Sequence, residues 1–134
     1  MKPFDSLRSA LMLTLLFFMV ACGENIAPTI GEARVSNSTA QRFQEFFVTL
    51  VGVEDLDGNV YAGKVKVHAE TAGQSFDEEI SPFAGEPDRT KGDVIFGLIL
   101  AGDIPLGTWK LKMIFEDEAG AESEPALVEV QLTR

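Results

Sequence analysis

The sequence predicts an all-β sandwich, and three observations lead to this prediction. Seven short segments after residue 28 are rich in β-branched and aromatic residues, and several alternate apolar with polar positions. Clusters of Gly, Pro, Asp and Asn separate these segments. No stretch after residue 22 has the 3.6-residue periodicity of an amphipathic helix. Many short strands without helices favour two packed antiparallel sheets.

The expected strands differ in how clearly they alternate. In chain order they are residues 29–35, 43–53, 60–68, 76–80, 94–100, 107–115 and 126–132. The sixth alternates most clearly, because every second residue from Trp109 to Phe115 is apolar and lysines lie between them. The fourth is weaker, and its acidic run from Asp77 to Glu79 is typical of a sheet edge that resists aggregation.

The strand expected at residues 43–53 is apolar on both faces. Its apolar side chains fall into two sets: Phe47, Val51 and Val53 on one face, and Phe46, Val48 and Leu50 on the other. We interpret it as a central strand with a bulge, because a bulge moves residues from one face to the other. The alternative is an exposed aromatic and aliphatic stripe, which would be a candidate contact surface.

Two loops stand out between the expected strands. Residues 36–41, SNSTAQ, predict a polar loop. Residues 81–93 form the longest irregular stretch and contain two prolines and two glycines. Loops of this length are either functional or merely tolerated, and the sequence leaves both alternatives open.

The first 22 residues differ from the rest of the chain. Lys2 and Arg8 are followed by an apolar run that ends at Cys22, the only cysteine, and this run is too short to span about 30 Å of hydrocarbon. The four residues ending at Cys22 read MVAC, and Gly23 follows. They resemble the lipobox of bacterial lipoproteins, although Met19 stands where Leu is usual.

The lipobox resemblance implies diacylglycerol on the Cys22 sulfur, cleavage before Cys22 and acylation of the new amino terminus. Acyl chains, at roughly 0.8 kcal/mol per buried methylene, would hold the protein to a bilayer. In such lipoproteins an Asp directly after the cysteine is the usual signal for retention in the inner membrane. Gly23 stands there instead, which favours anchoring in the outer membrane of a cell that has one. The alternative is an ordinary secretory signal cut near Ala21, which would leave Cys22 as a free thiol. The expected organisation is a signal peptide (1–21), a lipidated spacer (22–28) and a sandwich domain (29–134).

The mature chain would be strongly acidic. Removing residues 1–21 takes Lys2, Arg8 and Asp5 from the 11 Lys/Arg and 21 Asp/Glu, which leaves 9 basic and 20 acidic side chains and a net charge of about −11. Such a chain repels nucleic acid and anionic surfaces, and attracts cations or basic partners. With Cys22 lipidated no disulfide can form, so the domain depends on a single apolar core.

Turn motifs near the C-terminus carry a second resemblance. Residues 104–109 read IPLGTW, and residues 115–120 read FEDEAG. They are similar to the P-x-G-x-Y and D-x-A-G motifs of bacterial immunoglobulin-like and fibronectin-III-like domains, and a looser likeness covers most of residues 28–134. The resemblance implies an immunoglobulin-like β-sandwich of about seven antiparallel strands and says little about function. Trp109 replaces the usual tyrosine, so any corner hydrogen bond must use an indole N–H, which only donates.

Catalytic chemistry has little support in this sequence. The only histidine, His68, is expected on a solvent face beside Lys66, and no nucleophile-elbow motif is present. One histidine without a free thiolate also makes a poor zinc or copper site.

Acidic residues in two loops form the candidate metal site. In an immunoglobulin-like topology the loops after the second and sixth strands lie at one end, which would bring 54–57 close to 116–118. Asp55, Asp57 and Asp117 are therefore candidate calcium ligands, because calcium takes six to eight oxygens and crowded carboxylates repel each other without a cation. The spacing is not that of an EF-hand. The alternative is that these residues are solvated turn formers.

Together these observations predict a membrane-anchored cell-envelope lipoprotein whose immunoglobulin-like domain is a non-catalytic binding or scaffolding module. Its partners would be the membrane, through the lipid on Cys22, and a protein or glycan of the envelope, with no nucleic acid. A calcium-stabilised adhesion or surface-recognition module is one alternative. A small periplasmic hydrolase is another, for which the sequence shows no nucleophile.

Overall fold

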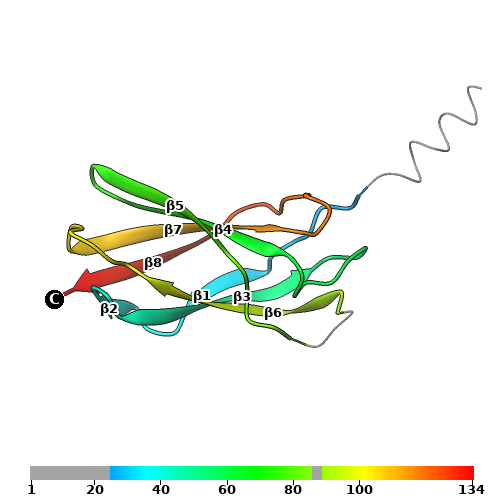
Figure 1. Ribbon diagram of the computed structural model, residues 1–134, viewed down its shortest axis with the longest axis horizontal. Helices are drawn as coiled ribbons and strands as arrows, with labels where there is room; N and C mark the ends of the chain where they lie inside the picture. The colour runs from blue at the N-terminus through cyan, green and yellow to red at the C-terminus, as the bar shows by residue number, and fades with distance from the viewer. Residues whose placement is uncertain (1–24, 86–88) are drawn as a thin grey trace, which may run out of the picture.

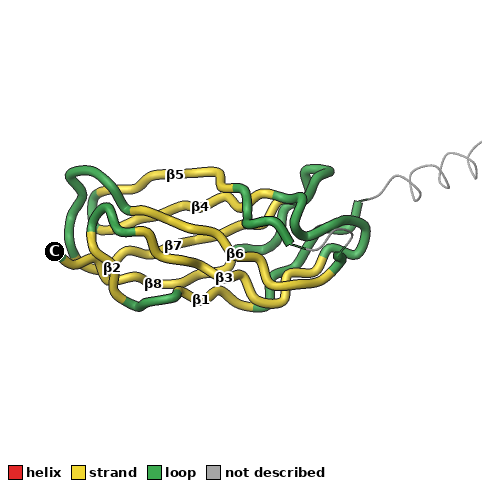
Figure 2. Tube along the Cα trace, turned by 60° about the horizontal axis from the view of Figure 1, so that its bottom comes forward, coloured by secondary structure: helices red, strands yellow, loops and turns green. Residues whose placement is uncertain are grey.

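The computed structural model describes residues 25–85 and 89–134, and these residues form strands and loops without a helix. The strands are β1 (Glu32–Val35), β2 (Thr39–Gln41), β3 (Glu45–Glu54), β4 (Lys64–Thr71), β5 (Gln74–Ile80), β6 (Lys91–Ile99), β7 (Gly107–Glu116) and β8 (Ala126–Thr133). They run in two layers along the long axis of the molecule (Figure 1). Most loops lie at the two ends of this axis (Figure 2).

Hydrogen bonds assemble the strands into two sheets. The smaller sheet has the order β1-β3-β6, and the larger has the order β2-β8-β7-β4-β5. Neighbouring strands are antiparallel except β2 and β8, which are parallel. The all-β sandwich that the sequence predicts is therefore confirmed.

Apolar side chains from both sheets fill the space between them. The smaller sheet contributes Phe46, Val48, Leu50, Val53, Val94, Phe96 and Leu98, and the larger contributes Val65, Val67, Ala69, Trp109, Leu111, Met113, Phe115, Val130 and Leu132. In β7 the buried and exposed positions alternate as expected, so its lysines face solvent. Removing these side chains from water is the main stabilising contribution to folding.

The bulge predicted for the strand at residues 43–53 lies near the end of β3. The pairing of β3 with β6 is in register up to Leu50, shifts, and resumes at Val53. Gly52 has a φ of 66°, in the left-handed region that glycine adopts at little cost. As a result Val53 is buried on the same side as Leu50, although an unbroken alternation would place the two on opposite faces.

Two expectations about strand positions were wrong. The loop expected at residues 36–41 contains β2, whose Ala40 is buried against the core and whose backbone pairs with β8. The strand expected at residue 60 begins instead at Lys64, because Asn59 starts a turn: its carbonyl accepts the Ala62 N–H at 3.1 Å and its side chain accepts the Tyr61 N–H at 3.1 Å. The strand expected at residues 76–80 corresponds to β5, which is a charged sheet edge as predicted.

The predicted signal peptide and Cys22 lie outside the described residues. Within residues 25–85 and 89–134, the chain has no helix of the length and hydrophobicity needed to cross a membrane.

Trp109 lies on the inner face of β7, the central strand of the larger sheet. Its side chain is fully buried, and its ring centroid is 5.6 Å from that of Phe76 on β5. The indole N–H donates to the carbonyl oxygen of Pro105 at 2.9 Å. This bond to the backbone four residues upstream satisfies the one polar atom of the side chain, as a donor-only group requires.

Replacing Trp109 should therefore test the packing of the core. We expect Trp109→Ala to lower the free energy of unfolding by about 3–5 kcal/mol, because it removes a large buried side chain and leaves a cavity. Urea denaturation measures this change. Leu127→Ala is the control: Leu127 is 71% exposed on the neighbouring β8, so a change within about 0.5 kcal/mol is expected. Equal effects of the two substitutions would contradict the assignment of Trp109 to the core.

Candidate functional site

Three carboxylates meet at one end of the sandwich, which we call the acidic pole (Asp55, Asp57 and Asp117). Asp55 and Asp57 follow β3, and Asp117 follows β7. One oxygen of each carboxylate lies within 4.8 Å of the corresponding oxygens of the other two. The described chain begins at this same end, and the C-terminus lies at the opposite end (Figure 1). The structure thus brings together the three residues that the sequence singled out as calcium candidates.

Asp55 is the most constrained member of the acidic pole. Only 1% of its surface is exposed, and its backbone N–H donates to the carbonyl oxygen of Thr90 at 2.7 Å. Its Oδ1 atom is buried and has no hydrogen-bond partner among the described residues. Gly58 leaves space for the carboxylate, because a Cβ atom on Gly58 would lie 2.3 Å from Asp55 Oδ2.

Asp117 organises the turn after β7. Its N–H donates to the carbonyl oxygen of Ala121 at 2.9 Å, and its Oδ1 accepts the Ala121 N–H at 2.8 Å. Gly120 completes the turn with a φ of 91°. Only 4% of Asp117 is exposed. The D-x-A-G motif is therefore a turn whose aspartate side chain is fixed toward the acidic pole.

The start of the described chain is hydrogen-bonded to the acidic pole. The side-chain amide of Asn25 donates to Asp117 Oδ2 at 3.0 Å, and the N–H of Ile26 donates to Asp57 Oδ2 at 2.9 Å. Neither residue was predicted from the sequence, because both lie in the expected spacer. No local pattern marks them, since Asn25 and Asp117 are 92 positions apart.

The pKa values of Asp55 and Asp57 are shifted in opposite directions. Burial raises the pKa of Asp55 to about 6, and the interaction with Asp57 and the charge of Asp117 act in the same direction. The pKa of Asp57 is lowered, chiefly because its carboxylate accepts the Ile26 N–H. Ionising Asp55 therefore costs free energy in the folded protein, because its negative charge is buried beside two others.

Other acidic residues of these loops do not join the pole. Glu116 Oε2 lies 2.9 Å from Lys66 Nζ, on the outer face of the larger sheet, and Glu122 pairs with the same lysine at 3.2 Å. The backbone of Glu54 is hydrogen-bonded to the backbone of Thr29. Glu118 is exposed. The loops thus bring together three of the six carboxylates expected there.

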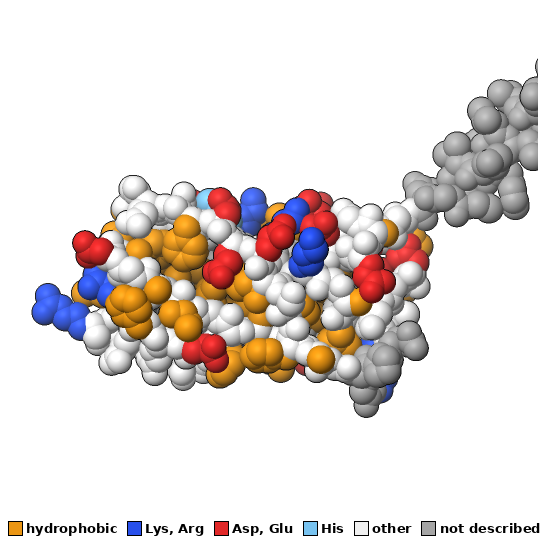
Figure 3. Space-filling model, viewed as in Figure 1, with side chains coloured by type: hydrophobic (Ala, Val, Ile, Leu, Met, Phe, Trp, Pro, Cys, Tyr) orange, Lys and Arg blue, Asp and Glu red, His pale blue; other side chains and the backbone are white. Residues whose placement is uncertain are grey.

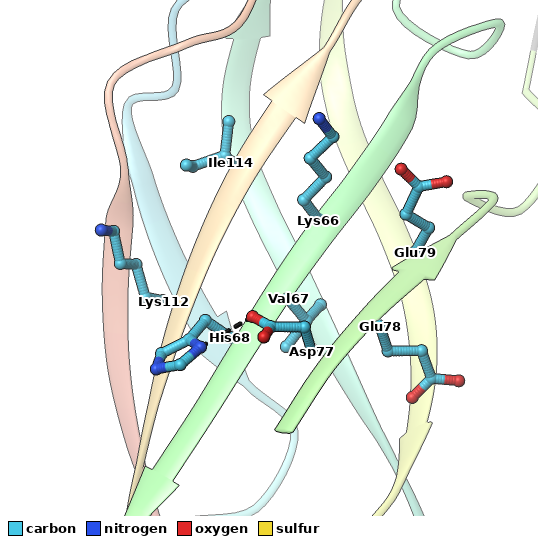
Figure 4. Close-up of a pocket in the computed structure, with 8 residues that line it drawn as sticks. All are labelled: Lys66, Val67, His68, Asp77, Glu78, Glu79, Lys112 and Ile114. Carbon is cyan, nitrogen blue, oxygen red and sulfur yellow. Dashed lines mark hydrogen bonds and ion pairs between the residues drawn. The ribbon is translucent and has the colours of Figure 1, made fainter. Parts of the chain in front are cut away.

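A shallow depression on the outer face of β4, β5 and β7 contains the only histidine (Figure 4). It has a volume of about 460 Å³ and is open to solvent. His68 Nδ1 lies 2.7 Å from Asp77 Oδ1, and its Nε2 lies 3.6 Å from Glu70. The described lining residues include no serine, threonine or cysteine, so this His-Asp pair has no nucleophile beside it.

Apolar side chains are exposed on the outer face of the smaller sheet, which we call the apolar face (Phe47, Phe83, Ile95 and Ile99). Their exposed fractions lie between 39% and 53%. Phe83 follows β5; its N–H donates to Ile95 O at 2.8 Å, and its ring centroid is 6.0 Å from that of Phe47. Hydrophobic side chains gather over the central and left parts of the side of the molecule in view (Figure 3). Of the apolar set expected on the outer side of this strand, only Phe47 is exposed, because Val51 is half-buried and the bulge turns Val53 into the core. The bulge is thus confirmed, and the other members of the apolar face come from segments outside residues 43–53.

No protein-family model matches the chain, and no curated protein matches it. Among solved structures, it is similar to the PKD domain of an M14-like peptidase from a Thermoplasmatales archaeon, with 20% identity, a TM-score of 0.50, and coverage of 83% of this chain and 100% of that one. It is also similar to a Niemann-Pick type C2 protein from the Japanese carpenter ant, with 8% identity, a TM-score of 0.56, and coverage of 83% and 96%.

A third similar structure is a cohesin module of a family 33 glycoside hydrolase from Clostridium perfringens, with 16% identity, a TM-score of 0.43, and coverage of 78% of this chain and 98% of that one. The chain has an immunoglobulin-like β-sandwich fold, as the turn motifs implied. At these identities the similarities concern the fold alone.

The His68–Asp77 pair predicts a pH-dependent contribution to stability. The hydrogen bond with Asp77, together with the nearby charge of Glu70, raises the pKa of His68 above its ordinary value, although Lys112 faces it from β7. Because the folded pKa exceeds the unfolded pKa, this contribution is present below the unfolded pKa of about 6.5 and is lost as the pH rises through the folded pKa. His68→Gln should therefore reduce stability more at pH 5.5 than at pH 8.5, as measured by urea denaturation.

Asp77→Asn is the matched variant, and NMR titration of the imidazole is its measurement. The pKa of His68 should fall when the Asp77 charge is removed. An unchanged His68 pKa would show that the pair does not form in solution.

Proposed function

We propose that this chain is a lipid-anchored, non-catalytic binding module of the cell envelope. The lipobox-like residues ending at Cys22 support the anchor. Asn25 lies three residues later and is already hydrogen-bonded to the sandwich. Three extended residues span about 10 Å, so the acidic pole would stand close to the bilayer and the opposite end would point away from it.

The site chemistry supports a binding role over catalysis. His68 is the only histidine, and it lies in an open depression lined mainly by charged residues. Enzyme sites are usually enclosed, so that water is excluded and the pKa values of acids and bases are tuned. Among the described residues that line the depression, no hydroxyl or thiol lies beside the His68–Asp77 pair.

The observation that carries the binding role is the apolar face. Phe47, Ile95 and Ile99 are exposed on the outer face of the smaller sheet and Phe83 lies beside them, and such clusters mark contact surfaces. The Glu45 side chain lies over Gly97 on this face, since a Cβ atom built on Gly97 would be 3.0 Å from Glu45 Cδ. Glu45 takes part in none of the ion pairs found among the described residues. An unpaired carboxylate among apolar groups suits a protein surface that presents Lys or Arg beside apolar side chains. The net negative charge of the chain favours the same partner.

Phe43 adds to the case for a contact surface at the membrane-distal end. It is 68% exposed and has a φ of 65°, the only non-glycine residue with a positive φ among those described. A phenylalanine in this region costs of order 1–2 kcal/mol relative to an ordinary conformation. Its N–H donates to the carbonyl oxygen of Leu100, next to Ile99 of the apolar face. A second exposed aromatic side chain thus lies near the strand end that carries Ile99.

Crosslinking in the native host tests the partner and its site. A photo-crosslinking residue in place of Ile99, on the apolar face, should capture an envelope protein, whereas the same residue in place of Leu127 should not. Leu127 is the matched control because it is a more exposed aliphatic residue on the other sheet. Glu45→Lys should remove most of the Ile99 adduct, since it places like charges together. Equal capture from both positions would contradict the assignment of the face, and capture of a glycan would overturn the choice of partner.

The anchor is tested separately by intact mass spectrometry of the membrane fraction. We expect a mass equal to residues 22–134 plus two or three acyl chains. Cys22→Ser should leave the precursor unlipidated and uncleaved at this position, because the sulfur that would receive the diacylglycerol is absent. A wild-type mass without lipid would indicate a secreted domain with a free thiol.

A further inference from the structure

We propose that Asp55, Asp57 and Asp117 bind a calcium ion, and that this ion fastens Asn25 and Ile26 to the sandwich. Calcium binding at this site requires neither a partner nor lipidation, so it stands apart from the proposed binding function. It rests on the convergence of three carboxylates, on a buried oxygen that lacks a partner, and on the contacts of Asn25 and Ile26 with the same carboxylates.

The buried Oδ1 atom of Asp55 is the observation that distinguishes this cluster from a solvated acidic loop. Burying a charged oxygen without a hydrogen bond costs free energy, because the oxygen loses its hydration and gains no other polar interaction. Only 1% of Asp55 is exposed, and its Oδ1 atom has no hydrogen-bond partner among the described residues. A cation held between the three carboxylates would supply the missing interaction.

The charge of the cluster is also not paired with a Lys, Arg or His side chain of the described residues. The ion pairs among residues 25–85 and 89–134 leave out Asp55, Asp57 and Asp117. The neighbouring Glu116, by contrast, is paired with Lys66. Three carboxylates at this separation repel each other in a partly buried site, and a divalent cation would leave a net charge of only −1.

The donor atoms favour calcium over other metals. The cluster offers only oxygen, and the one histidine lies away from it on the outer face of β4, so zinc and copper lack their preferred ligands. Oxygens on opposite sides of a calcium ion are about 4.6–5.2 Å apart, and those across magnesium are about 4.0–4.2 Å apart. The three oxygens, all within 4.8 Å of one another, fit inside a calcium shell. Magnesium usually keeps several waters and is held through one or two carboxylates, so three converging carboxylates favour calcium.

Asn25 and Ile26 connect this site to the chain that leads from Cys22. The Asn25 amide donates to both oxygens of Asp117, at 3.0 and 3.3 Å, and rotation about its last side-chain bond would present its oxygen to the ion instead. The Ile26 N–H orients Asp57 through Oδ2. An ion held by Asp57 and Asp117 would therefore stabilise the docked position of both residues.

Calorimetry and thermal unfolding of the full chain in detergent test the site with calcium chloride as the probe. Binding should be measurable at about 1–5 mM, the range in which extracellular calcium modules are occupied, and should raise the melting temperature by about 5 °C relative to EDTA. Equal melting temperatures in calcium and EDTA would overturn the proposal. An equal response to magnesium chloride would overturn the choice of metal.

Matched variants separate ligands from other acidic residues. Asp57→Asn should weaken calcium binding at least about tenfold, the loss of one carboxylate from the site, while its amide oxygen can still accept the Ile26 N–H. Asp77→Asn, an exposed carboxylate on β5, should leave binding unchanged. Asp55→Asn should raise the melting temperature in EDTA and abolish the response to calcium, because it removes an uncompensated buried charge. Equal calcium responses in Asp57→Asn and Asp77→Asn would contradict the assignment.

Hydrogen exchange tests whether the ion fastens the chain. The Ile26 amide donates to Asp57, so its exchange should slow at least about tenfold when calcium replaces EDTA. The Phe83 amide, which donates to Ile95 on the apolar face, is the internal control and should exchange at the same rate in both conditions. Calcium binding without slower exchange at Ile26 would overturn the fastening role. Because these measurements need no partner, they are independent of the crosslinking result.

Discussion

Burial of one face of each sheet, without a covalent cross-link, is the constraint on which the rest of this structure depends. Cys22 is the only cysteine, so no disulfide joins the two sheets, and the described domain is held by packing, hydrogen bonds and surface ion pairs. The large side chains of Trp109, Phe96 and Phe115 fill the space between the sheets. Since the inner faces are committed to the core, ligand chemistry is confined to the loops at the ends and to the outer faces. The acidic pole and the apolar face occupy these two kinds of position.

Those features that follow from side-chain periodicity could be predicted from the sequence. The alternation in β7 gave both its strand and its buried face, because a period of two is a direct consequence of strand geometry. The bulge in β3 was signalled by two apolar sets that a regular strand cannot bury together. The meeting of Asp55 and Asp57 with Asp117 followed from topology, since the corresponding loops of an immunoglobulin-like sandwich lie at one end.

Features that depend on backbone contacts between distant segments could not be predicted in this way. β2 is three residues long and mostly polar, and it exists because its backbone pairs with β8. The burial of Asp55 depends on the Thr90 carbonyl and on the space beside Gly58, neither of which leaves a pattern in the sequence. Phe83 reaches Phe47 from a loop expected to be irregular, so the extent of the apolar face appeared only with the tertiary structure.

The proposed anchor and the proposed calcium site would act on each other through charge. If Cys22 carries the lipid, the acidic pole stands within about 10 Å of the membrane surface, which is close to the Debye length of about 8 Å at physiological ionic strength. Three uncompensated carboxylates at that distance would be repelled by anionic headgroups, and the domain would tilt away on its short spacer. A bound calcium ion would remove most of that repulsion and would also tie Asn25 and Ile26 to the sandwich. The domain would then stand upright, with the apolar face along its side and the turn between β2 and β3 at its far end (Figure 1). One ion would in this way set the direction in which the binding surface faces its partner.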